Sequence, residues 1–304
     1  MKTKTAGILY VVAAYVSWGL LPIYWKMLNQ VPAAQIIAHR ILWSFVFVIL
    51  LLWRQNRWPE FKKTFSKGKN RRLCILTAFI IGANWFTYIW AVNAERILDA
   101  SLGYFINPLL SVLLGVIFLK ERLNFWQKVA LILAFIGVIY KTLQYGKIPW
   151  VALTLAFTFG VYGLLRKKAH IKSLVGFSAE MVLLSPIVFT FLVMEEIKGT
   201  GVTGHAAFSI HLLLLVAGIV TAAPLLWFTY GVRKIPLSTA GFLQYIAPSF
   251  QLFLGVVVYK ELFTSTHLIS FSFIWVALIL YSFSNTRILK RQKVENRKLK
   301  MKNG

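Results

Sequence analysis

Residues 209–231 read SIHLLLLVAGIVTAAPLLWFTYG and contain no Asp, Glu, Lys or Arg. An α-helix needs about 20 mostly apolar residues to cross the hydrocarbon core of a bilayer. The stretch is therefore long and apolar enough to predict a transmembrane helix. Because its apolar character is continuous, it differs from the alternating strands, roughly 10 residues long, of a membrane β-barrel.

Nine further stretches have the same character, so we expect an all-α membrane protein with ten transmembrane helices. These stretches are 6–28, 35–53, 73–93, 99–119, 125–143, 149–165, 173–194, 236–258 and 266–285. The composition agrees, because 58% of the residues are hydrophobic, against about 45–50% in soluble domains. The single cysteine, Cys74, excludes a disulfide framework and a cysteine-based metal site.

The basic residues fall mostly on one side of the predicted spans. The chain has 34 Lys and Arg against 9 Asp and Glu, a net charge of +25. With the N-terminus in the cytoplasm, 27 of these 34 lie on the cytoplasmic side and 6 on the other, and Arg40 lies within a span. Cytoplasmic loops carry such an excess. We therefore expect both termini in the cytoplasm, and we favour topology over nucleic-acid binding as the reason for the charge.

The chain contains an internal repeat. A shift of 140 positions aligns residues 82–121 with 222–261 without a gap. The alignment pairs residue types that an apolar composition does not force to match: Pro108 with Pro248, Gly115 with Gly255, Lys120 with Lys260, and Glu121 with Glu261. Chance matching between apolar segments is the alternative interpretation.

This repeat predicts two five-helix halves, residues 1–145 and 146–286, followed by a basic cytoplasmic tail, 287–304. Because five is odd, the second half enters the membrane from the opposite side to the first. Inverted repeats of this kind are found in many secondary transporters, where the substrate lies near the bilayer midplane between the halves. We expect a polar cavity in that position.

Two charged residues lie at membrane depth, where each costs about 2.5–3.5 kcal/mol on insertion scales. Arg40 follows His39 in one span, and Glu180 lies in another; the 140-residue shift carries Arg40 onto Glu180. We expect them to be ~12 Å apart along the membrane normal, at 1.5 Å per helical residue, so that water or substrate joins them. In the functional interpretation, Arg40 attracts anionic groups, and Glu180 contacts a cation or carries a proton. In the structural interpretation, both reach toward opposite interfaces and fix helix packing.

Other polar and aromatic side chains recur in most of the predicted spans. The stretch 129–139 carries no hydrogen-bonding side chain, and the polar residues of 269–280 are serines, so we expect the spans 125–143 and 266–285 at the periphery. Pro108 and Pro248 remove backbone hydrogen bonds there, as hinges or as static kinks. We predict no metal, cofactor or catalytic residue. The candidate substrate-binding residues are Trp18, His39, Arg40, Asn84, Tyr88, Asn107, Glu180, Trp227 and Gln244.

Several stretches resemble RarD-type proteins of the EamA group in the drug/metabolite transporter superfamily. They are SWGLLPIYWK (17–26), AHRILWS (38–44), NWFTYIWAVN (84–93), SLGYFINPL (101–109), GVYGLLRK (160–167) and LQYIAP (243–248). The resemblance covers nearly the whole chain. It implies ten helices in two inverted repeats, a multi-pass location in the bacterial plasma membrane, and the export or exchange of small solutes. It supplies no set of binding residues to carry over.

We therefore expect a secondary transporter that moves a small amphipathic metabolite or drug by alternating access. Its expected partners are that solute and membrane lipids, with protons and a second copy of the chain as further candidates, and no nucleic acid. Two other classes were weighed, namely a membrane-embedded enzyme acting on a lipid-like substrate and a channel or receptor. The sequence contains no H-E-x-x-H, G-x-S-x-G or P-loop motif, and its external loops are too short for a ligand-binding domain.

Overall fold

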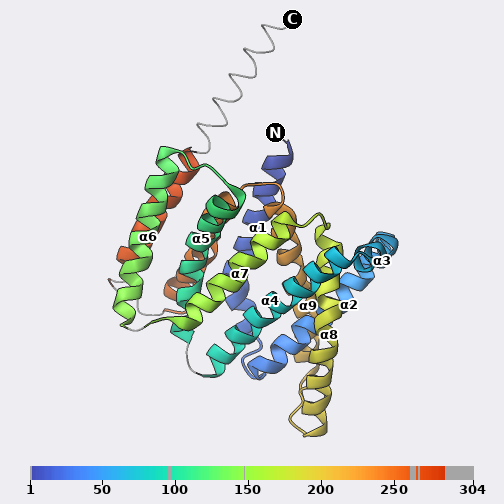
Figure 1. The fold of residues 1–304 in the computed structure, drawn as a ribbon. Helices are drawn as coiled ribbons and strands as arrows, with labels where there is room; N and C mark the ends of the chain where they lie inside the picture. Colours follow the sequence, from blue (N-terminus) through green and yellow to red (C-terminus); the bar gives the residue numbers. More distant parts are fainter. Residues whose placement is uncertain (1, 95–96, 147, 261–264, 266–267, 285–304) are drawn as a thin grey trace, which may run out of the picture.

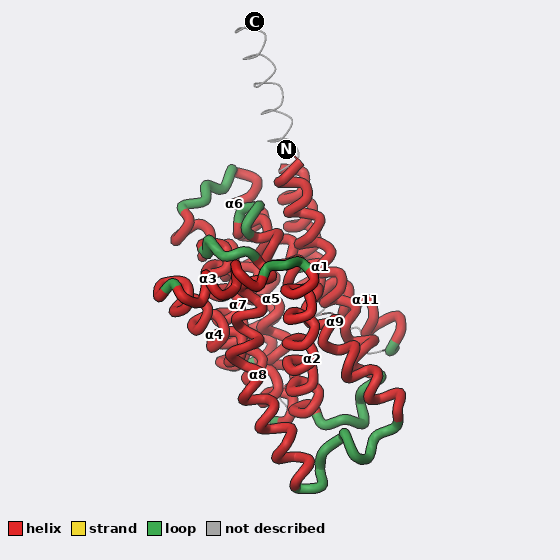
Figure 2. Tube along the Cα trace, turned by 90° about the vertical axis from the view of Figure 1, so that its right-hand side faces the viewer, coloured by secondary structure: helices red, strands yellow, loops and turns green. Residues whose placement is uncertain are grey.

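The structure is a computed structural model of the 304-residue chain, described here except for residues 1, 95–96, 147, 261–264, 266–267 and 285–304. The described part is helical and contains no strand, as Figure 2 shows. The long helices pack side by side into one bundle, with the first residues of the chain at one end (Figure 1). The all-α class expected from the sequence is confirmed for these residues.

The helices follow the predicted spans closely. In chain order they are α1 (Lys2–Lys26), α2 (Ala33–Arg54), α3 (Trp58–Ser66), α4 (Gly68–Asn93), α5 (Ile97–Leu119), α6 (Phe125–Tyr145), α7 (Trp150–Lys168), α8 (Ser173–Ile197), α9 (Phe208–Val232), α10 (Leu237–Gln244), α11 (Ile246–Phe253), a π-helical turn η1 (Leu254–Val258) and a C-terminal helix Leu268–Ser284. Among the described residues, seven segments have the length and apolar composition to cross a membrane: α1, α2, α5, α6, α8, α9 and the continuous run Leu237–Val258.

A short helix, α3, lies in the basic segment that the predicted spans 35–53 and 73–93 leave between them as a loop. It begins with Trp58 and Pro59, and a proline is tolerated in a first helical turn because no intrahelical partner is lost there. The Trp58 and Phe61 rings stack at 5.2 Å. Burial raises the pKa of Glu60, but its hydrogen bonds with Arg57 and Lys172 outweigh burial and hold that pKa below its ordinary value. The bond to Lys172 ties α3 to the start of α8.

The predicted span 236–258 is not one regular helix. Pro248 has no N–H to donate to the carbonyl of Gln244, and α10 ends at Gln244 before α11 begins at Ile246. A π-helical turn follows, in which the Tyr259 N–H donates to the Leu254 carbonyl at 2.9 Å. Pro108 occupies the equivalent position of the first half, yet α5 remains one continuous helix. The two proline-containing helices therefore have the same local sequence signal and different backbones.

Two positions paired by the 140-residue shift share an unusual backbone conformation. Lys120 and Lys260 have φ angles of 53° and 54°, in the left-handed region that few residues other than glycine adopt. In addition, the Tyr245 hydroxyl donates to the carbonyl of its paired residue, Phe105, at 3.3 Å. These observations support the repeat on which the functional proposal below depends.

The helix core divides into a central and a peripheral part. The largest cluster of buried residues joins α1, α2, α4, α7, α8 and α9, whereas α6 and the helix Leu268–Ser284 pack together against α5 and α10. Figure 1 shows α6 at the side of the bundle. These two helices correspond to the stretches 125–143 and 266–285, so the predicted peripheral position is confirmed.

The crossing of α2 and α9 depends on Gly218. A Cβ atom there would lie 2.4 Å from the Trp43 carbonyl carbon and 2.7 Å from the Ser44 nitrogen, and the Ser44 hydroxyl donates to the Gly218 carbonyl at 3.0 Å. Small residues allow helix backbones in membranes to approach this closely. The α2–α9 contact therefore cannot accommodate a side chain without separation of the helices.

We predict that Gly218→Ala lowers the free energy of unfolding by about 1–3 kcal/mol, the usual cost of overpacking. Gly68→Ala is the matched control, because a Cβ at Gly68 meets nothing within 4 Å. The measurement is thermal unfolding of the detergent-purified protein. Equal stability of the two variants would contradict the close α2–α9 contact.

Candidate functional site

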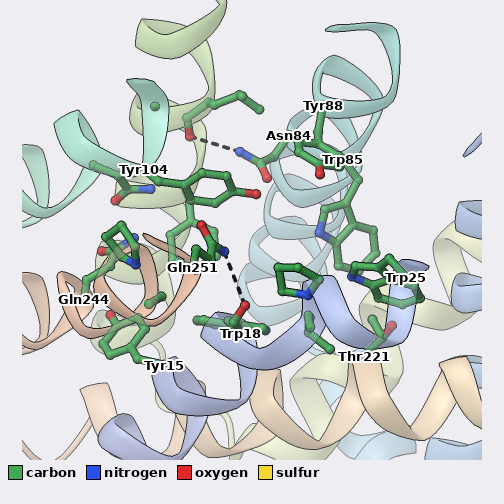
Figure 3. Close-up of a pocket in the computed structure, with 18 of the residues that line it drawn as sticks. Tyr15, Trp18, Trp25, Asn84, Trp85, Tyr88, Tyr104, Thr221, Gln244 and Gln251 are labelled. Carbon is green, nitrogen blue, oxygen red and sulfur yellow. Dashed lines mark hydrogen bonds between the residues drawn. The ribbon is translucent and has the colours of Figure 1, made fainter. Parts of the chain in front are cut away.

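A cavity of about 620 Å³ lies between the two halves of the chain. Its walls come from α1, α2, α4 and α5 of the first half and from α7, α9, α10, α11 and η1 of the second. The volume falls within the range of about 300–1,000 Å³ that is usual for small-molecule sites. Figure 3 shows aromatic rings and side-chain amides directed toward the same space. The principal polar and aromatic lining residues are Tyr15, Trp18, Trp25, Lys26, Arg40, Asn84, Trp85, Tyr88, Tyr104, Asn107, Phe159, Thr221, Gln244, Gln251 and Tyr259.

A proline in α1 makes part of the wall polar. Pro22 has no N–H to donate to the carbonyl of Trp18, one helical turn earlier. That carbonyl instead accepts a hydrogen bond from the Gln251 side-chain nitrogen of α11 at 3.4 Å (Figure 3). This hydrogen bond supplies the Trp18 carbonyl with a donor and joins α1 of the first half to α11 of the second.

Arg40 is held in the cavity wall by two neighbouring helices. Its Nε donates to the Thr221 hydroxyl of α9 at 2.9 Å, and its guanidinium carbon lies 4.5 Å from the Trp25 ring centroid of α1. Among the described residues, no carboxylate forms an ion pair with Arg40. The guanidinium is therefore fixed in orientation without being neutralised by an acidic side chain.

Three amide side chains contribute further polar groups. The Asn84 nitrogen donates to the Leu155 carbonyl at 3.0 Å and to the Thr158 hydroxyl at 2.8 Å, which binds α4 to α7. The Asn107 oxygen accepts from Ser111 in the next turn of α5. The buried side-chain oxygen of Gln244 has no hydrogen-bond partner within the described part of the protein. A solute with a donor group can supply the missing bond at Gln244.

Six of the nine candidate residues line this cavity: Trp18, Arg40, Asn84, Tyr88, Asn107 and Gln244. His39, Trp227 and Glu180 do not. His39 precedes Arg40, and successive helical residues point about 100° apart, so the two face different surroundings. Trp227 follows the cavity residue Leu225 by two positions and packs against the central core instead.

Glu180 lies in a fully buried polar cluster between α7 and α8. It accepts a hydrogen bond from the Tyr162 hydroxyl at 2.9 Å, and its Oε1 lies 3.6 Å from Arg166 Nη1. Arg166, 1% exposed, also donates to the Ser173 carbonyl at 3.0 Å. Gly176 provides the space, because a Cβ there would lie 1.8 Å from Arg166 Nη1.

This cluster corrects the sequence analysis at one residue. The predicted span 149–165 ends before Arg166 and leaves it with Lys167 and Lys168 on the cytoplasmic side, but its side chain is buried against Glu180. The end of α7 turns Arg166 toward α8, and a buried charge requires a partner. Glu180 therefore has a protein partner of opposite charge, rather than the water-mediated or solute-mediated link to Arg40 that we expected.

The sequence analysis also missed several cavity residues, including Trp25, Tyr104, Thr221 and Gln251. A usable signal existed for Gln251, because it follows Gln244 by seven positions, and this spacing places residues on one helix face. Thr221 has no such signal, since an isolated threonine in an apolar span is common and its role here depends on Arg40 in another helix.

Comparison with known proteins agrees with a helical membrane fold. The model of the EamA-like transporter family matches residues 5–142 and again residues 147–283. The chain belongs to the EamA-like transporter family. It is 44% identical over 285 residues to the "Uncharacterized transporter YojE" of Bacillus subtilis, covering 92% of this chain and 95% of that protein. It is 41% identical over 280 residues to "Protein RarD" of Escherichia coli, again covering 92% and 95%. It is thus a RarD-type member of the family.

A solved structure described only as a "Crystal structure of protein" has the same fold. Its TM-score is 0.70 at 17% sequence identity, and the match covers 90% of this chain and 96% of that one. At this identity the likeness concerns the fold alone. Together, the family matches and the helical bundle make this chain a multi-pass membrane protein of a transporter family.

We predict that Arg166→Met lowers the free energy of unfolding by about 3–5 kcal/mol, because it leaves the buried Glu180 carboxylate without its cation. The double variant Arg166→Met/Glu180→Leu should recover most of this loss, since neither charge remains buried. Thermal and denaturant unfolding of the purified protein measure both effects.

The control is Glu60→Gln, which removes the partly exposed pairs of Glu60 with Arg57 and Lys172, whose side chains are 20% and 64% exposed against 34% for Glu60. Exposed pairs contribute about 0–1 kcal/mol. A double variant no more stable than Arg166→Met would show that the pair is not energetically coupled and would contradict this account.

Proposed function

We propose that this protein is a secondary transporter that moves a small amphipathic metabolite or drug across the bacterial plasma membrane by alternating access. The observation that carries the proposal is the cavity itself, which takes its walls from both halves of the chain. The cavity reaches the end where α1 terminates at Lys26 and where Tyr259 follows η1. We infer that the cavity opens at that end.

At the opposite end the two halves contact each other directly. Glu121, just after α5, accepts hydrogen bonds from the backbone N–H groups of Leu237 and Ser238 at 2.6 and 2.9 Å and from the Ser238 hydroxyl at 2.6 Å. A carboxylate at the start of a helix such as α10 is stabilised by the unpaired N–H groups and by the helix dipole. At the same end, a Cβ on Gly7 of α1 would lie 2.8 Å from Ile235.

The proposed topology has ten spans in two inverted halves, 1–145 and 146–286, with both termini and the tail 287–304 in the cytoplasm. Support comes from the two separate family matches, which begin at residues 5 and 147, and from the shared backbone conformation of Lys120 and Lys260. In this topology α1 ends outside the cell, so the cavity opens outward and the Glu121 contact seals the cytoplasmic end.

Arg40 and Glu180 occupy paired positions in the two inverted halves, so we expect them to have corresponding places in the two states of the transport cycle. In an inverted repeat, the opposite state is reached when the halves exchange conformations around the site. Arg40 lines the outward cavity in this state, so its paired position, Glu180, should line the inward cavity in the other state. Glu180 is accordingly the proposed proton carrier, although it lies outside the present cavity.

We predict saturable uptake of a solute by proteoliposomes that contain this protein. A thermal-stability panel of amino acids, small metabolites and chloramphenicol selects the solute, because a ligand of the folded state raises its apparent stability. Gln244→Leu should reduce uptake about tenfold, because it removes one hydrogen bond between the solute and a buried acceptor. The loss of such a bond costs about 1–3 kcal/mol. Ser270→Ala, in the peripheral helix, should leave it unchanged.

The Glu180→Gln variant separates proton coupling from transport itself. Wild-type protein should accumulate the solute more strongly when a pH gradient is imposed across the vesicle membrane, and Glu180→Gln should transport it without that response. An identical response in both proteins would remove Glu180 from the coupling role. Conversion of the solute into a new compound would instead support the membrane-embedded enzyme that the sequence analysis kept as an alternative.

A further inference from the structure

We propose that the cavity selects an amphipathic anion: a flat apolar body that carries one carboxylate, which Arg40 binds. This inference rests on the proposed transport function, since it names the class of solute for the same cavity. Four observations carry it, namely the charges that line the cavity, the unused donors of Arg40, the position of Lys26 and the arrangement of the aromatic rings.

The charge in the cavity has one sign. Arg40 and Lys26 are both cationic, and none of the described residues that line the cavity is acidic. Two described carboxylates of the bundle, Glu180 and Glu121, have partners elsewhere, because Glu180 pairs with Arg166 and Glu121 binds the start of α10. An unneutralised guanidinium at membrane depth is costly. A bound anion would reduce that cost, whereas a bound cation would increase it.

The fixed orientation of Arg40 suits a carboxylate. A guanidinium has five N–H donors in a planar fork, which can bind both oxygens of a carboxylate at once. Of the nitrogens of Arg40, only Nε donates to a described residue, the Thr221 hydroxyl. The two terminal nitrogens remain available on the other edge. The Trp25 ring, 4.5 Å from the guanidinium carbon, limits rotation of the plane, so the fork is positioned before the solute arrives.

The second cation lies at the entrance rather than beside Arg40. Lys26 is the last residue of α1, and its ammonium lies 3.7 Å from the Tyr259 ring centroid. A positive charge at the mouth attracts anions and raises their rate of entry. Because Lys26 already contacts Tyr259, the deep part of the cavity offers one cationic group. This favours a solute with one negative charge over a dianion.

The walls around Arg40 suit an apolar body. Trp18 packs edge-on against Phe159 at 5.7 Å, and Trp85 and Tyr88 contribute further rings from α4 (Figure 3). Such walls bind flat apolar groups through their large buried area and their preference for edge-on or offset contacts. The unpaired oxygen of Gln244 can additionally accept a hydrogen bond from a donor on the body.

The test compares four probes that share a phenyl ring and a three-carbon chain but differ in charge: 3-phenylpropionate, 3-phenylpropionamide, 3-phenylpropylamine and phenylalanine. Binding to the full-length protein in lipid nanodiscs is measured by tryptophan fluorescence, since three tryptophans line the cavity, and by thermal stabilisation. We expect 3-phenylpropionate to bind at least about tenfold more tightly than its amide, as a charged hydrogen bond of about 1.5–3 kcal/mol requires.

Variants assign this preference to Arg40. Arg40→Gln should bind 3-phenylpropionate and its amide equally. Arg40→Lys retains a positive charge and should keep part of the preference for 3-phenylpropionate. The lysine variant keeps the test decisive if the glutamine variant does not fold. Arg71→Gln is the matched control, because Arg71 is an exposed arginine at the start of α4, away from the cavity. It should behave as wild type.

Several results would overturn the inference. Binding of the amide, the amine or phenylalanine as tightly as 3-phenylpropionate would exclude selection for a single anion. A preference that survives in Arg40→Gln would exclude Arg40 as its cause. If none of the four probes binds the folded protein, the aromatic-anion class is wrong. In each case the transport proposal is judged separately, by uptake of the solutes in the thermal-stability panel.

Discussion

A charged or hydrogen-bonding group within the hydrocarbon core must find its partner inside the protein, because lipid tails offer none. In this chain the requirement is met in two different ways. Glu180 and Arg166 neutralise each other in a fully buried cluster, with Tyr162 as an additional donor. Arg40 has a hydroxyl and an aromatic ring but no carboxylate among the described residues. In the first arrangement each charge has a partner of opposite charge, whereas the second leaves a binding capacity for a solute.

The same constraint explains why the prolines matter. Each proline in a helix removes one backbone donor and leaves a carbonyl to be satisfied by another group. Pro22 leaves the Trp18 carbonyl to Gln251 on the other side of the cavity, and Pro248 accompanies the end of α10 and the start of α11. At Pro22 and Pro248, regular hydrogen bonding is therefore interrupted where the helices line a cavity. This is where membrane proteins tolerate irregular backbone.

Much of the fold follows from local sequence, and much of the site does not. Continuous apolar runs predicted the helices, and the poverty of hydrogen-bonding side chains in 125–143 and 266–285 predicted their peripheral position. Arg40 could be singled out because it interrupts an apolar run. Arg166 could not, because it adjoins Lys167 and Lys168 and only the rotation of α7 against α8 buries it. Likewise Pro108 and Pro248 are equivalent in sequence, yet only the second helix is broken, and the local sequence signal does not distinguish them.

We infer that the end of the bundle at the Glu121 contact opens during transport, and the chain's only cysteine can report this opening. Cys74 lies in α4 toward the sealed end and is 1% exposed. The measurement is the rate at which N-ethylmaleimide modifies Cys74 in membrane vesicles. Glu121→Gln should raise this rate about tenfold, because it weakens charge-assisted hydrogen bonds of about 1.5–3 kcal/mol.

Glu196→Gln is the control, since Glu196 accepts a comparable bond from the Thr203 N–H at 2.8 Å, beyond the opposite end of the bundle. It should leave the rate of Cys74 modification at the wild-type value. An unchanged rate in Glu121→Gln, or an equal increase in both variants, would contradict an alternating opening controlled by the Glu121 contact.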